Sequence, residues 1–417
     1  MTQLPYLTAD LPGIGGKIKQ QPEDFSVDEI PLYPLSGEGT HVFFRVTKKG
    51  VPTPAAADRI ARHMGVSVKS IGVAGLKDSN AVTTQWMSIE HADIHHLEQF
   101  SDPKVAVSGI TRHTNKLKLG HLAGNRFGIK VRDIDAQALE RAKQVMDILV
   151  LRGVPNFFGP QRFGLRGDTG QLGRALVMNK LDDFTRIFLG EPSPADPPDI
   201  REARKAFDAG DYDRAYDAWP GHYADQRKAL RNFRKRHDPQ SVVASVDWRL
   251  RRLFVSAFQS EVFNRVLEQR LHDIDRVQPG DLAQKTGTGG IFLVEDVQAE
   301  QPRCERFEIS PTGPVPGYRC RLAEGEAGQI ERKVMRAMEI ENVEIRRVGK
   351  LEVRGARRAL RFGLTEPELS QGTDEHGEFL SVAFAAPSGC YATIVLGEIM
   401  KVDPLGRGGD DQPGEAS

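Results

Sequence analysis

The residues with the clearest chemical potential are Lys77 and Asp78, which stand side by side in a glycine-containing stretch. A carboxylate on a loop between two strands is held rigidly yet stays accessible, which suits a nucleophile or a general base. The Lys77 ammonium would favour the ionised form of Asp78 by charge proximity if the two side chains meet. The alternative is that Asp78 and Asn80 are ordinary turn residues that bond their own backbone. The residue types alone leave both interpretations open.

The elements that would hold this loop can be predicted from the apolar pattern around it. The run Val68–Ala74 has strand character and leads into the loop, and the strand-like run Val82–Ile89 leaves it. Upstream, the alternation of Phe25 and Val27 predicts another strand. Thr53, as an N-cap, predicts a helix that follows it. The sequence therefore places the Lys77–Asp78 pair among strands, with a helix close by in the chain.

Two stretches are rich in cations. Residues 111–132 contain no acidic residue, and their cations are Arg112, Lys116, Lys118, Arg126, Lys130 and Arg132. Such a strip is typical of contact with nucleic-acid phosphates, and equally typical of a solvated hairpin edge guarded against pairing. The second cluster comprises Arg227, Lys228, Arg231, Arg234, Lys235 and Arg236. On a helix these residues would spread around most of the surface, which favours a solvated face and leaves contact with RNA as the second interpretation.

Composition limits the class of protein. The chain has 417 residues, enough for two domains, and its 39% hydrophobic content permits a sizeable core. Lys+Arg and Asp+Glu both number 57, so any affinity for nucleic acid must come from local clusters. Cys304, Cys320 and Cys390 lack CxxC spacing and suit a reducing cytoplasm, without indicating zinc or an iron–sulfur cluster. Neither a secretory signal nor a membrane-spanning run is visible, so we expect a soluble cytoplasmic protein.

The stretch around Asp78 resembles the catalytic motif of the TruD family of tRNA pseudouridine synthases. The matching string is Gly75-Leu76-Lys77-Asp78-x-x-Ala81-x-Thr83-Thr84-Gln85. In that family the aspartate of the motif is the essential catalytic residue. The resemblance implies this role for Asp78, and it implies that Lys77 keeps Asp78 ionised or contacts a phosphate.

Further stretches resemble motifs of the same family and follow in the family's order. They are Pro22-Glu-Asp-Phe25-x-Val27-x-Glu29, Arg112-His113-x-x-Lys116 to Gly124-Asn125-x-Phe127, Asn156-Phe-Phe-Gly159-x-Gln-Arg162-Phe-Gly164, Phe258-Gln-Ser260-x-x-Phe263-Asn264, Ile309-Ser-Pro-Thr-Gly313, and Gly389-x-Tyr391-Ala-Thr393. By resemblance, Phe25, Phe127 and Tyr391 would enclose the target base, and Asn125 would hold its polar edge or the loop. Phenylalanine is common at the position of Tyr391, so the phenol here adds a possible proton handler. On composition alone, the Asn156–Gly164 loop is either a base-binding loop or a packed boundary loop.

The resemblance implies an α+β fold with a pseudouridine synthase catalytic domain around a mixed, largely antiparallel sheet. An inserted α/β TRUD domain would interrupt it. The expected boundaries are 1–153 for the first catalytic segment, 154–352 for the inserted domain and 353–403 for the second catalytic segment. A disordered tail is expected at 404–417, because the end of the chain is polar and glycine-rich.

The implied activity is the conversion of uridine to pseudouridine in tRNA, with uridine 13 as the expected target. The N1 glycosidic bond must break, the uracil must turn, and C5 must join the ribose, which requires a base outside its stack. Asp78 would attack C1′ of the ribose or C6 of the ring, and both routes stay open. No cofactor and no metal are expected, the partner is a tRNA substrate without a membrane, and the protein is expected to be a monomer.

Two other functions fit parts of the sequence. An RNA-binding or RNA-folding protein on the same scaffold would need the basic stretches but not Asp78. A methyltransferase would need a glycine loop for its cofactor after a first strand. Gly13–Gly16 precedes the first predicted strand, and Thr286–Gly290 lacks the ending of a phosphate loop. The methyltransferase is therefore disfavoured.

Overall fold

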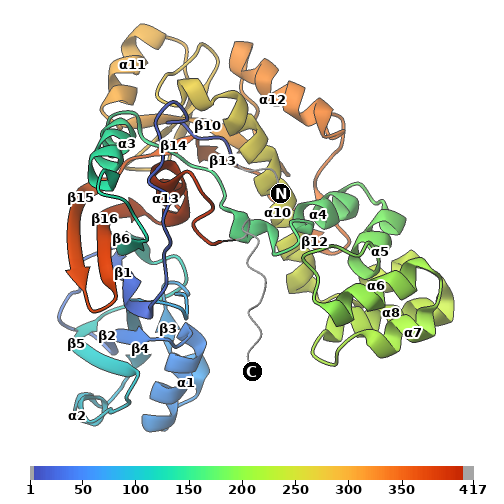
Figure 1. The fold of residues 1–417 in the computed structure, drawn as a ribbon, viewed down its shortest axis with the longest axis horizontal. Coiled ribbons are helices and arrows are strands. Elements are labelled where there is room, and N and C mark those ends of the chain that lie inside the picture. Colours follow the sequence, from blue (N-terminus) through green and yellow to red (C-terminus); the bar gives the residue numbers. More distant parts are fainter. Residues whose placement is uncertain (1–3, 407–417) are drawn as a thin grey trace. The chain divides into compact units, whose positions relative to one another are not determined.

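The chain folds as two compact units in the computed structural model, which describes residues 4–406. We call Pro5–Val154 together with the residues from Phe362 onward the sheet unit, and Pro155–Arg361 the helical unit (Figure 1). The expected disordered tail at 404–417 lies outside the described residues from 407 onward. The two units are described separately below.

The sheet unit is built on an eight-stranded sheet in the order β15-β16-β6-β1-β4-β2-β5, with β3 paired to β4. Its strands are β1 (Phe25–Pro31), β2 (His41–Lys49), β3 (Gly72–Val73), β4 (Val82–Glu90), β5 (Val105–His113), β6 (Leu122–Arg132), β15 (Thr365–Asp374) and β16 (Gly377–Pro387). β1 and β4 run parallel, and the other neighbours are antiparallel. The expected mixed, largely antiparallel sheet is confirmed. β16 pairs with β6 and β15 pairs with β16, so one sheet combines strands from residues 25–132 with strands from residues 365–387.

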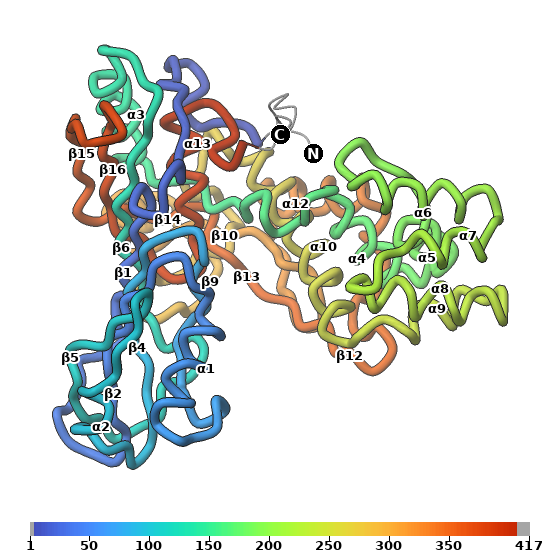
Figure 2. The backbone as a smooth tube through the Cα atoms, turned by 60° about the horizontal axis from the view of Figure 1, so that its bottom comes forward, coloured from blue at the N-terminus to red at the C-terminus, as the bar shows by residue number. Residues whose placement is uncertain are grey.

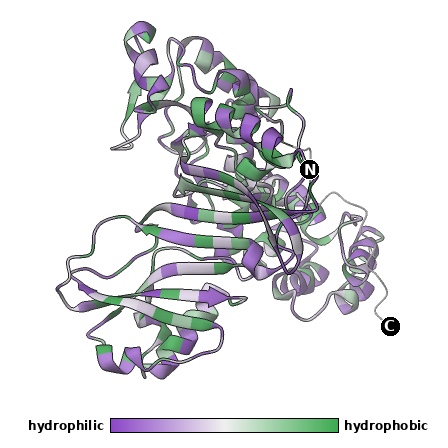
Figure 3. Ribbon diagram, turned by 60° about the vertical axis from the view of Figure 1, so that its left-hand side comes forward, coloured by the Kyte–Doolittle hydropathy of each residue, from purple (hydrophilic) through white to green (hydrophobic). Residues whose placement is uncertain are grey.

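Alternation of buried and exposed residues explains why these segments form strands. In β1 the side chains of Phe25 and Val27 are buried and Ser26 between them is exposed, as a two-residue period requires. Figure 3 shows the same change between apolar and polar residues along the strands. One face of β2 and β4 is covered by α1 (Thr53–His63), whose Ala56, Ala57 and Ile60 belong to the same buried cluster as Phe44 and Met87.

The remaining helices of the sheet unit are short or lie near its C-terminal strands. They are η1 (Pro22–Asp24), η2 (Val68–Ser70), α2 (Ile94–Glu98), α3 (Ala138–Arg152) and α13 (Ala392–Met400). α3 contacts both β15 and α13. Residues far apart in the sequence thus pack together at this end of the sheet (Figure 1).

The prediction of a strand over Val68–Ala74 is wrong for most of that run. The structure has the single turn η2 and then β3, which covers only Gly72–Val73. The Ser67 side chain accepts a hydrogen bond from Lys69 N and starts this turn. At Gly72 a Cβ atom would lie 2.5 Å from the carbonyl oxygen of Leu117. The close approach of the neighbouring loop therefore requires glycine in this short strand.

The helical unit combines helices with a four-stranded antiparallel sheet in the order β13-β10-β8-β9. Its elements are η3 (Pro160–Phe163), α4 (Thr169–Val177), α5 (Leu181–Leu189), α6 (Pro198–Asp208), α7 (Tyr212–Ala218), α8 (Ala224–Arg236), α9 (Pro239–Ser245), α10 (Trp248–Gln269), η4 (Leu271–Asp273), β8 (Leu282–Lys285), β9 (Ile291–Leu293), α11 (Val297–Glu305), β10 (Ile309–Val315), α12 (Gly325–Ala337), β11 (Arg347–Val348), β12 (Leu351–Glu352) and β13 (Ala356–Ala359). The 22-residue α10 contacts α4, α12 and β10 and supplies buried aromatic residues, so it is the central helix of this unit. Figure 2 shows α5 to α9 gathered in one group.

The chain passes between the units in β7 (Val154–Pro155) and β14 (Arg361–Phe362), which pair as a two-stranded sheet. The sequence predicts the return to the first unit at residue 353, whereas the structure places it at Phe362. The difference arises because β13 pairs with β10 of the helical unit. Residues 353–361 therefore belong to the inserted segment.

Candidate active site

Asp78 lies on the loop that connects β3 with β4, and buried hydrogen bonds hold this loop to its surroundings. The backbone N–H of Lys77 donates to Thr53 Oγ1 at 2.9 Å, and the Thr53 hydroxyl donates to Gln85 Oε1 at 2.7 Å. Gln85 Nε2 donates in turn to the carbonyl oxygen of Gly75 at 3.1 Å. Thr53 was expected to cap α1, but it is the first residue of that helix and its side chain binds the loop instead. The loop is therefore fixed at two points before it reaches Asp78.

A buried cation lies behind the same loop. Lys48 Nζ donates to the carbonyl oxygen of Asp78 at 2.9 Å and lies 3.5 Å from that of Lys77. Lys48 is only 1% exposed. Burial lowers the pKa of Lys48 to about 8, against the opposing effect of the Asp78 charge. Lys48 thus holds the backbone at Asp78 and leaves the carboxylate free to face outward.

The Asp78 carboxylate is partnered by Lys19, which the sequence does not single out. Lys19 Nζ donates to Asp78 Oδ2 at 2.5 Å, and the N–H of Asn80 donates to Oδ1 at 3.3 Å. Burial alone would raise the pKa of Asp78, but the hydrogen bond and charge of Lys19 outweigh it and hold that pKa below its usual value. The Asp78 side chain remains 48% exposed. The site therefore presents an ionised and accessible carboxylate at neutral pH.

Lys77 does not pair with Asp78, contrary to one expectation from the sequence. Its Nζ donates to Asn125 Oδ1 at 2.6 Å and lies 3.0 Å from Glu29 Oε2, with both ion-pair side chains nearly buried. Burial raises the pKa of Glu29 and the charge of Lys77 opposes this. Glu29 also accepts a hydrogen bond from the backbone N–H of Trp86. Lys77 therefore links the loop to β1 and β6 from the inside.

Three phenylalanines form a cluster beside Lys19. The Lys19 ammonium lies 4.5 Å from the centroid of the Phe25 ring. Phe25 and Phe127 meet edge to face with centroids 6.3 Å apart, and Phe127 lies 5.3 Å from Phe384. Their exposures are 6%, 8% and 1% in the order Phe25, Phe127 and Phe384. The structure thus brings Phe25 next to the partner of Asp78, and Phe127 behind it.

Asn125 and Tyr391 belong to neighbouring segments of the same sheet end. Asn125 lies opposite Glu29 on β1 and opposite Ala386 on β16. After β16 ends, the N–H of Ser388 donates to the carbonyl oxygen of Ala123 at 2.9 Å. Tyr391 follows this turn, is half-buried and stands directly before α13. The structure therefore joins the segment that leads to Tyr391 to the strand that carries Asn125.

Three cations of the basic strip at 111–132 form ion pairs with acidic side chains of the protein. Arg132 is 5% exposed and pairs with Asp24 and Asp374. Lys130 pairs with Asp374 at 2.6 Å, and Arg126 pairs with Glu366. An RNA-contacting role for Arg132 is therefore wrong, because its charge is neutralised and covered.

The Asn156–Gly164 loop is a packed loop of the helical unit. Asn264 Oδ1 accepts from the N–H of Phe158 and its Nδ2 donates to the Phe158 carbonyl oxygen, both at 2.9 Å. The Arg358 guanidinium lies 4.1 Å from the Phe158 ring centroid and donates to the Asn156 carbonyl oxygen at 3.1 Å. Arg162 donates to Ser256 and Ser260 on α10. These contacts show that the loop is packed, and base binding by its exposed Gln161 side stays a prediction.

Two features are absent from residues 4–406. In this range no group of three or more His, Cys, Asp or Glu side chains is placed to hold a metal ion. Within the same described part of the chain, no helix has both the length and the apolar surface needed to cross a membrane.

Comparisons with known proteins cover nearly the whole chain. Residues 2–399 match the family described as tRNA pseudouridine synthase D, TruD. A tRNA pseudouridine synthase D from Geobacter metallireducens is 42% identical over 95% of this chain and 97% of its own length. The tRNA pseudouridine synthase D from Geobacter sulfurreducens is 41% identical over 95% of this chain and 96% of its own length.

A solved structure gives an independent comparison of the fold. The protein from Methanosarcina mazei, described as a putative tRNA pseudouridine synthase D, superposes with a TM-score of 0.84 at 30% identity. The match covers 96% of this chain and 97% of the other. Sequence and fold agree over both units, and the chain belongs to the TruD family of tRNA pseudouridine synthases.

Proposed function

We propose that this protein converts a uridine of tRNA into pseudouridine and that Asp78 is its nucleophile. The observation that carries the proposal is the state of Asp78, whose carboxylate is ionised and accessible on a loop fixed from behind. The relatives that this chain matches over 97% and 96% of their own length are each named tRNA pseudouridine synthase D. Uridine 13 is the target that we propose.

The reaction is an isomerisation whose atoms balance without a cofactor. The bond between uracil N1 and ribose C1′ breaks, the ring turns, and a bond forms between C5 and C1′. The proton on C5 is lost to solvent and N1 gains one. Asp78 attacks C1′ of the ribose or C6 of the ring, and either route needs the ionised carboxylate.

The residues around Asp78 have separate proposed roles. Lys19 keeps the carboxylate ionised and orients it through the hydrogen bond to Oδ2. Phe25 and Phe127 supply the apolar side of the site, and Tyr391 stacks on the target uracil. Asn125 and Lys77 hold the loop through their hydrogen bond. The protein acts in the cytoplasm as a monomer, and sedimentation of the enzyme alone and with tRNA tests the latter.

The experiment measures release of tritium from [5-³H]uridine-labelled tRNA, followed by mapping of pseudouridine. We expect Asp78→Asn to lower the rate by about a thousandfold or more, because removing a nucleophile has effects of this order. The exposed Asp147 on α3 provides the matched control, and Asp147→Asn should retain the wild-type rate. Mapping should place the product at position 13.

The alternative is an RNA-binding or RNA-folding protein on this scaffold. It predicts that wild-type protein binds tRNA without releasing tritium, and that Asp78→Asn retains its function in cells. Equal release by wild type and Asp78→Asn would instead remove Asp78 from the mechanism. Pseudouridine mapped at a position other than 13 would uphold the proposed reaction and show that uridine 13 is not the target.

A further inference from the structure

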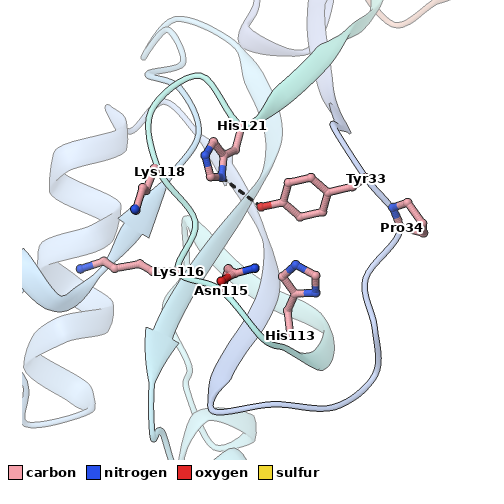
Figure 4. A pocket seen from close by; sticks show the side chains of 7 residues that line it. All are labelled: Tyr33, Pro34, His113, Asn115, Lys116, Lys118 and His121. Carbon is pink, nitrogen blue, oxygen red and sulfur yellow. Dashed lines mark hydrogen bonds between the residues drawn. The ribbon is translucent and has the colours of Figure 1, made fainter.

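The sheet unit contains a second candidate site, a surface cavity of about 520 Å³. Its lining includes Tyr33, His113, Asn115, Lys116, Lys118 and His121. Figure 4 shows Lys116 and Lys118 on the side opposite Tyr33, with His121 between Lys118 and Tyr33 and His113 below the Tyr33 ring. We call it the Tyr33 cavity. The roles proposed for the residues around Asp78 use none of these side chains, and Lys116 and Lys118 are two cations of the 111–132 strip for which the sequence left both interpretations open.

The aromatic side of the cavity is preorganised. The rings of Tyr33 and His113 stack at 5.0 Å with an interplanar angle of 18°. The Tyr33 hydroxyl and His121 Nδ1 share a hydrogen bond of 3.0 Å. On its other side His113 meets the buried Phe43 edge to face, and the N–H of Ser36 donates to His113 Nδ1. A planar group that enters the cavity would therefore meet rings that are already held in place.

The opposite side carries positive charge that the protein does not neutralise. Lys118 is exposed, and among residues 4–406 it has no ion pair with an acidic side chain. Lys116 Nζ donates to the carbonyl oxygen of Lys69 at 3.2 Å, a neutral partner that leaves the charge uncompensated. Within the same described part of the chain, the residues that line the cavity include no Asp or Glu. An anion is therefore the complementary ligand on this side of the cavity. The other cations of the strip, Arg126, Lys130 and Arg132, already have acidic partners within the protein.

The loop that carries both lysines is attached to the loop of Asp78. The N–H of Gly120 donates to the carbonyl oxygen of Ala74 at 2.8 Å, and the N–H of Leu117 donates to Ser88 Oγ on β4 at 3.1 Å. Ala74 precedes Asp78 by four residues, so their Cα atoms are at most about 15 Å apart. Lys118 stands two residues before Gly120, so the path through this hydrogen bond limits the separation of the Lys118 and Asp78 Cα atoms to roughly 30 Å. A single RNA strand of several nucleotides spans such a separation.

We propose that the Tyr33 cavity binds a nucleotide of the substrate RNA that flanks the target uridine. Lys116 and Lys118 bind its phosphate, and the paired rings of Tyr33 and His113 contact its base. This inference rests on the proposed function, since the RNA is taken to be the substrate whose uridine reaches Asp78. It adds a subsite that positions the strand and takes no part in bond breaking.

The test is RNA binding in the Asp78→Asn background, so that no turnover interferes. The double variant Lys116→Gln with Lys118→Gln is compared with Lys104→Gln with Lys143→Gln, two exposed lysines of the same unit outside the cavity. Each lysine removed from an RNA phosphate lowers the slope of log Kd against log salt by about 0.7, so the slope of the cavity variant should fall by about 1.4. At ~0.15 M salt the same relation gives about a tenfold weaker Kd, and the control pair should match its parent.

Substitution of Tyr33 separates stacking from charge. Tyr33→Leu should weaken RNA binding and leave the salt slope unchanged, because a base stacked on a ring releases no counterion. Tyr33→Phe keeps the ring and should bind RNA nearly as the parent does. With Asp78 intact, the Lys116/Lys118 variant and Tyr33→Leu should raise KM for RNA and leave kcat unchanged, because none of these side chains contacts the reacting atoms, and Tyr33→Phe should keep the KM of wild type.

The outcomes distinguish this inference from the proposed function. If the Lys116/Lys118 variant binds RNA with the affinity and salt slope of the Lys104/Lys143 control, the subsite is wrong, while tritium release by wild type still upholds the reaction. If wild type releases no tritium, the proposed reaction fails, and the binding comparison still decides whether the cavity contacts RNA. Competition by UMP at concentrations near the KM for RNA would show a site for free nucleotides and overturn the assignment to an RNA strand.

Discussion

Three lysines lie at the Asp78 loop, and each has a different partner. Lys19 pairs with the carboxylate, Lys48 with the backbone carbonyl of the same residue, and Lys77 with Glu29 and Asn125. Two of these cations are nearly buried and hold the loop, and the third acts on the ionisation of Asp78. This division explains how a partly desolvated carboxylate stays charged without losing its access to solvent.

Removing the charge of Lys19 should change the pH dependence of the reaction. Lys19→Met removes the two largest interactions that oppose the burial of Asp78 and leaves the backbone hydrogen bonds from Ser79 and Asn80, so the pKa of Asp78 rises and the acid limb of the rate moves to higher pH. At neutral pH we expect kcat to fall by about one to two orders of magnitude, which corresponds to one charge-assisted hydrogen bond. The measurement is single-turnover rate against pH.

Lys17 offers the control for this variant. It lies two residues away, is exposed and pairs with Asp133 at 3.2 Å. Lys17→Met should keep both the rate and the pH profile of wild type. An unchanged acid limb in Lys19→Met would show that Lys19 does not set the ionisation of Asp78.

At the scale of elements, Arg132 joins parts of the sheet unit that are distant in the chain. It stands at the end of β6, pairs with Asp24 in η1 and reaches Asp374 at the end of β15. The hydrogen bonds from Arg132 lower the pKa of Asp374. For Asp24, burial would raise the pKa, but the hydrogen bonds and charge of Arg132 together with the backbone hydrogen bond from Gln21 and the charge of Lys130 lower it. Arg132, one of the six cations of the basic strip, thus stabilises the sheet unit through ion pairs.

Breaking this network should destabilise the sheet unit. Asp24 is completely buried, so Asp24→Asn leaves a covered guanidinium with one carboxylate fewer, and the free energy of unfolding should fall by about 3–5 kcal/mol. Asp133→Asn, which removes an exposed ion pair with Lys17, should change it by about 1 kcal/mol or less. Urea denaturation measures both, and equal effects of the two substitutions would contradict the structural role of Asp24.

The same network predicts how stability responds to acid. Since the folded-state pKa values of Asp24 and Asp374 lie below those of the unfolded chain, their stabilisation is complete above about pH 4 and is lost as the pH falls through the folded-state values. Asp24→Asn has less of this stabilisation to lose. Its midpoint for urea unfolding should therefore fall less steeply between neutral pH and about pH 3 than that of wild type.

At the scale of the whole molecule, a chain with a formal charge of zero must bind RNA through local placement of its cations. In α8 the prediction of cations spread around the helix needs a correction. Arg227 and Arg234 turn toward the Tyr216 ring, with guanidinium-to-centroid distances of 4.3 and 5.1 Å. Lys228, Arg231, Lys235 and Arg236 stay exposed. The spacing of the first three by three and four residues places those three on one face, which Arg236 does not share. The helical unit thus has a cationic stripe.

We predict that this stripe contacts RNA phosphates. Changing Lys228, Arg231 and Lys235 together to Gln should weaken tRNA binding and lower its salt slope by about 0.7–0.9 for each phosphate that the stripe no longer neutralises, with kcat unchanged. The control changes Lys205, Lys333 and Lys350 to Gln, which are exposed lysines of the same unit on three different segments. Affinity is measured by filter binding at several salt concentrations. Equal affinity of both triple variants would show that the stripe faces solvent and does not contact RNA.

The sequence by itself determined the features that depend on neighbouring residues. Alternation around Phe25 and Val27 predicted β1, and the apolar run after Asp78 predicted β4, because strand patterns are local. The order of the motifs identified the family, and the family and the fold class are confirmed. The candidate site residues follow from the same motifs and remain predictions for the variants above to test.

Only the tertiary structure decided which charges meet. Lys19 and Asp78 are 59 positions apart in the chain, and Arg132 reaches Asp24 over 108 and Asp374 over 242. The pairing of β6 with β16, and of β16 with β15, brings Arg132 to Asp374, and the bridge between Lys17 and Arg132 places the segment of Lys19 beside β6. No local pattern encodes these pairings. The same reason explains the return of the chain at Phe362, since β13 is held by pairing with β10. Long-range strand pairing, invisible in any short stretch of sequence, therefore determines which lysine ionises Asp78 and which arginine is closed to RNA.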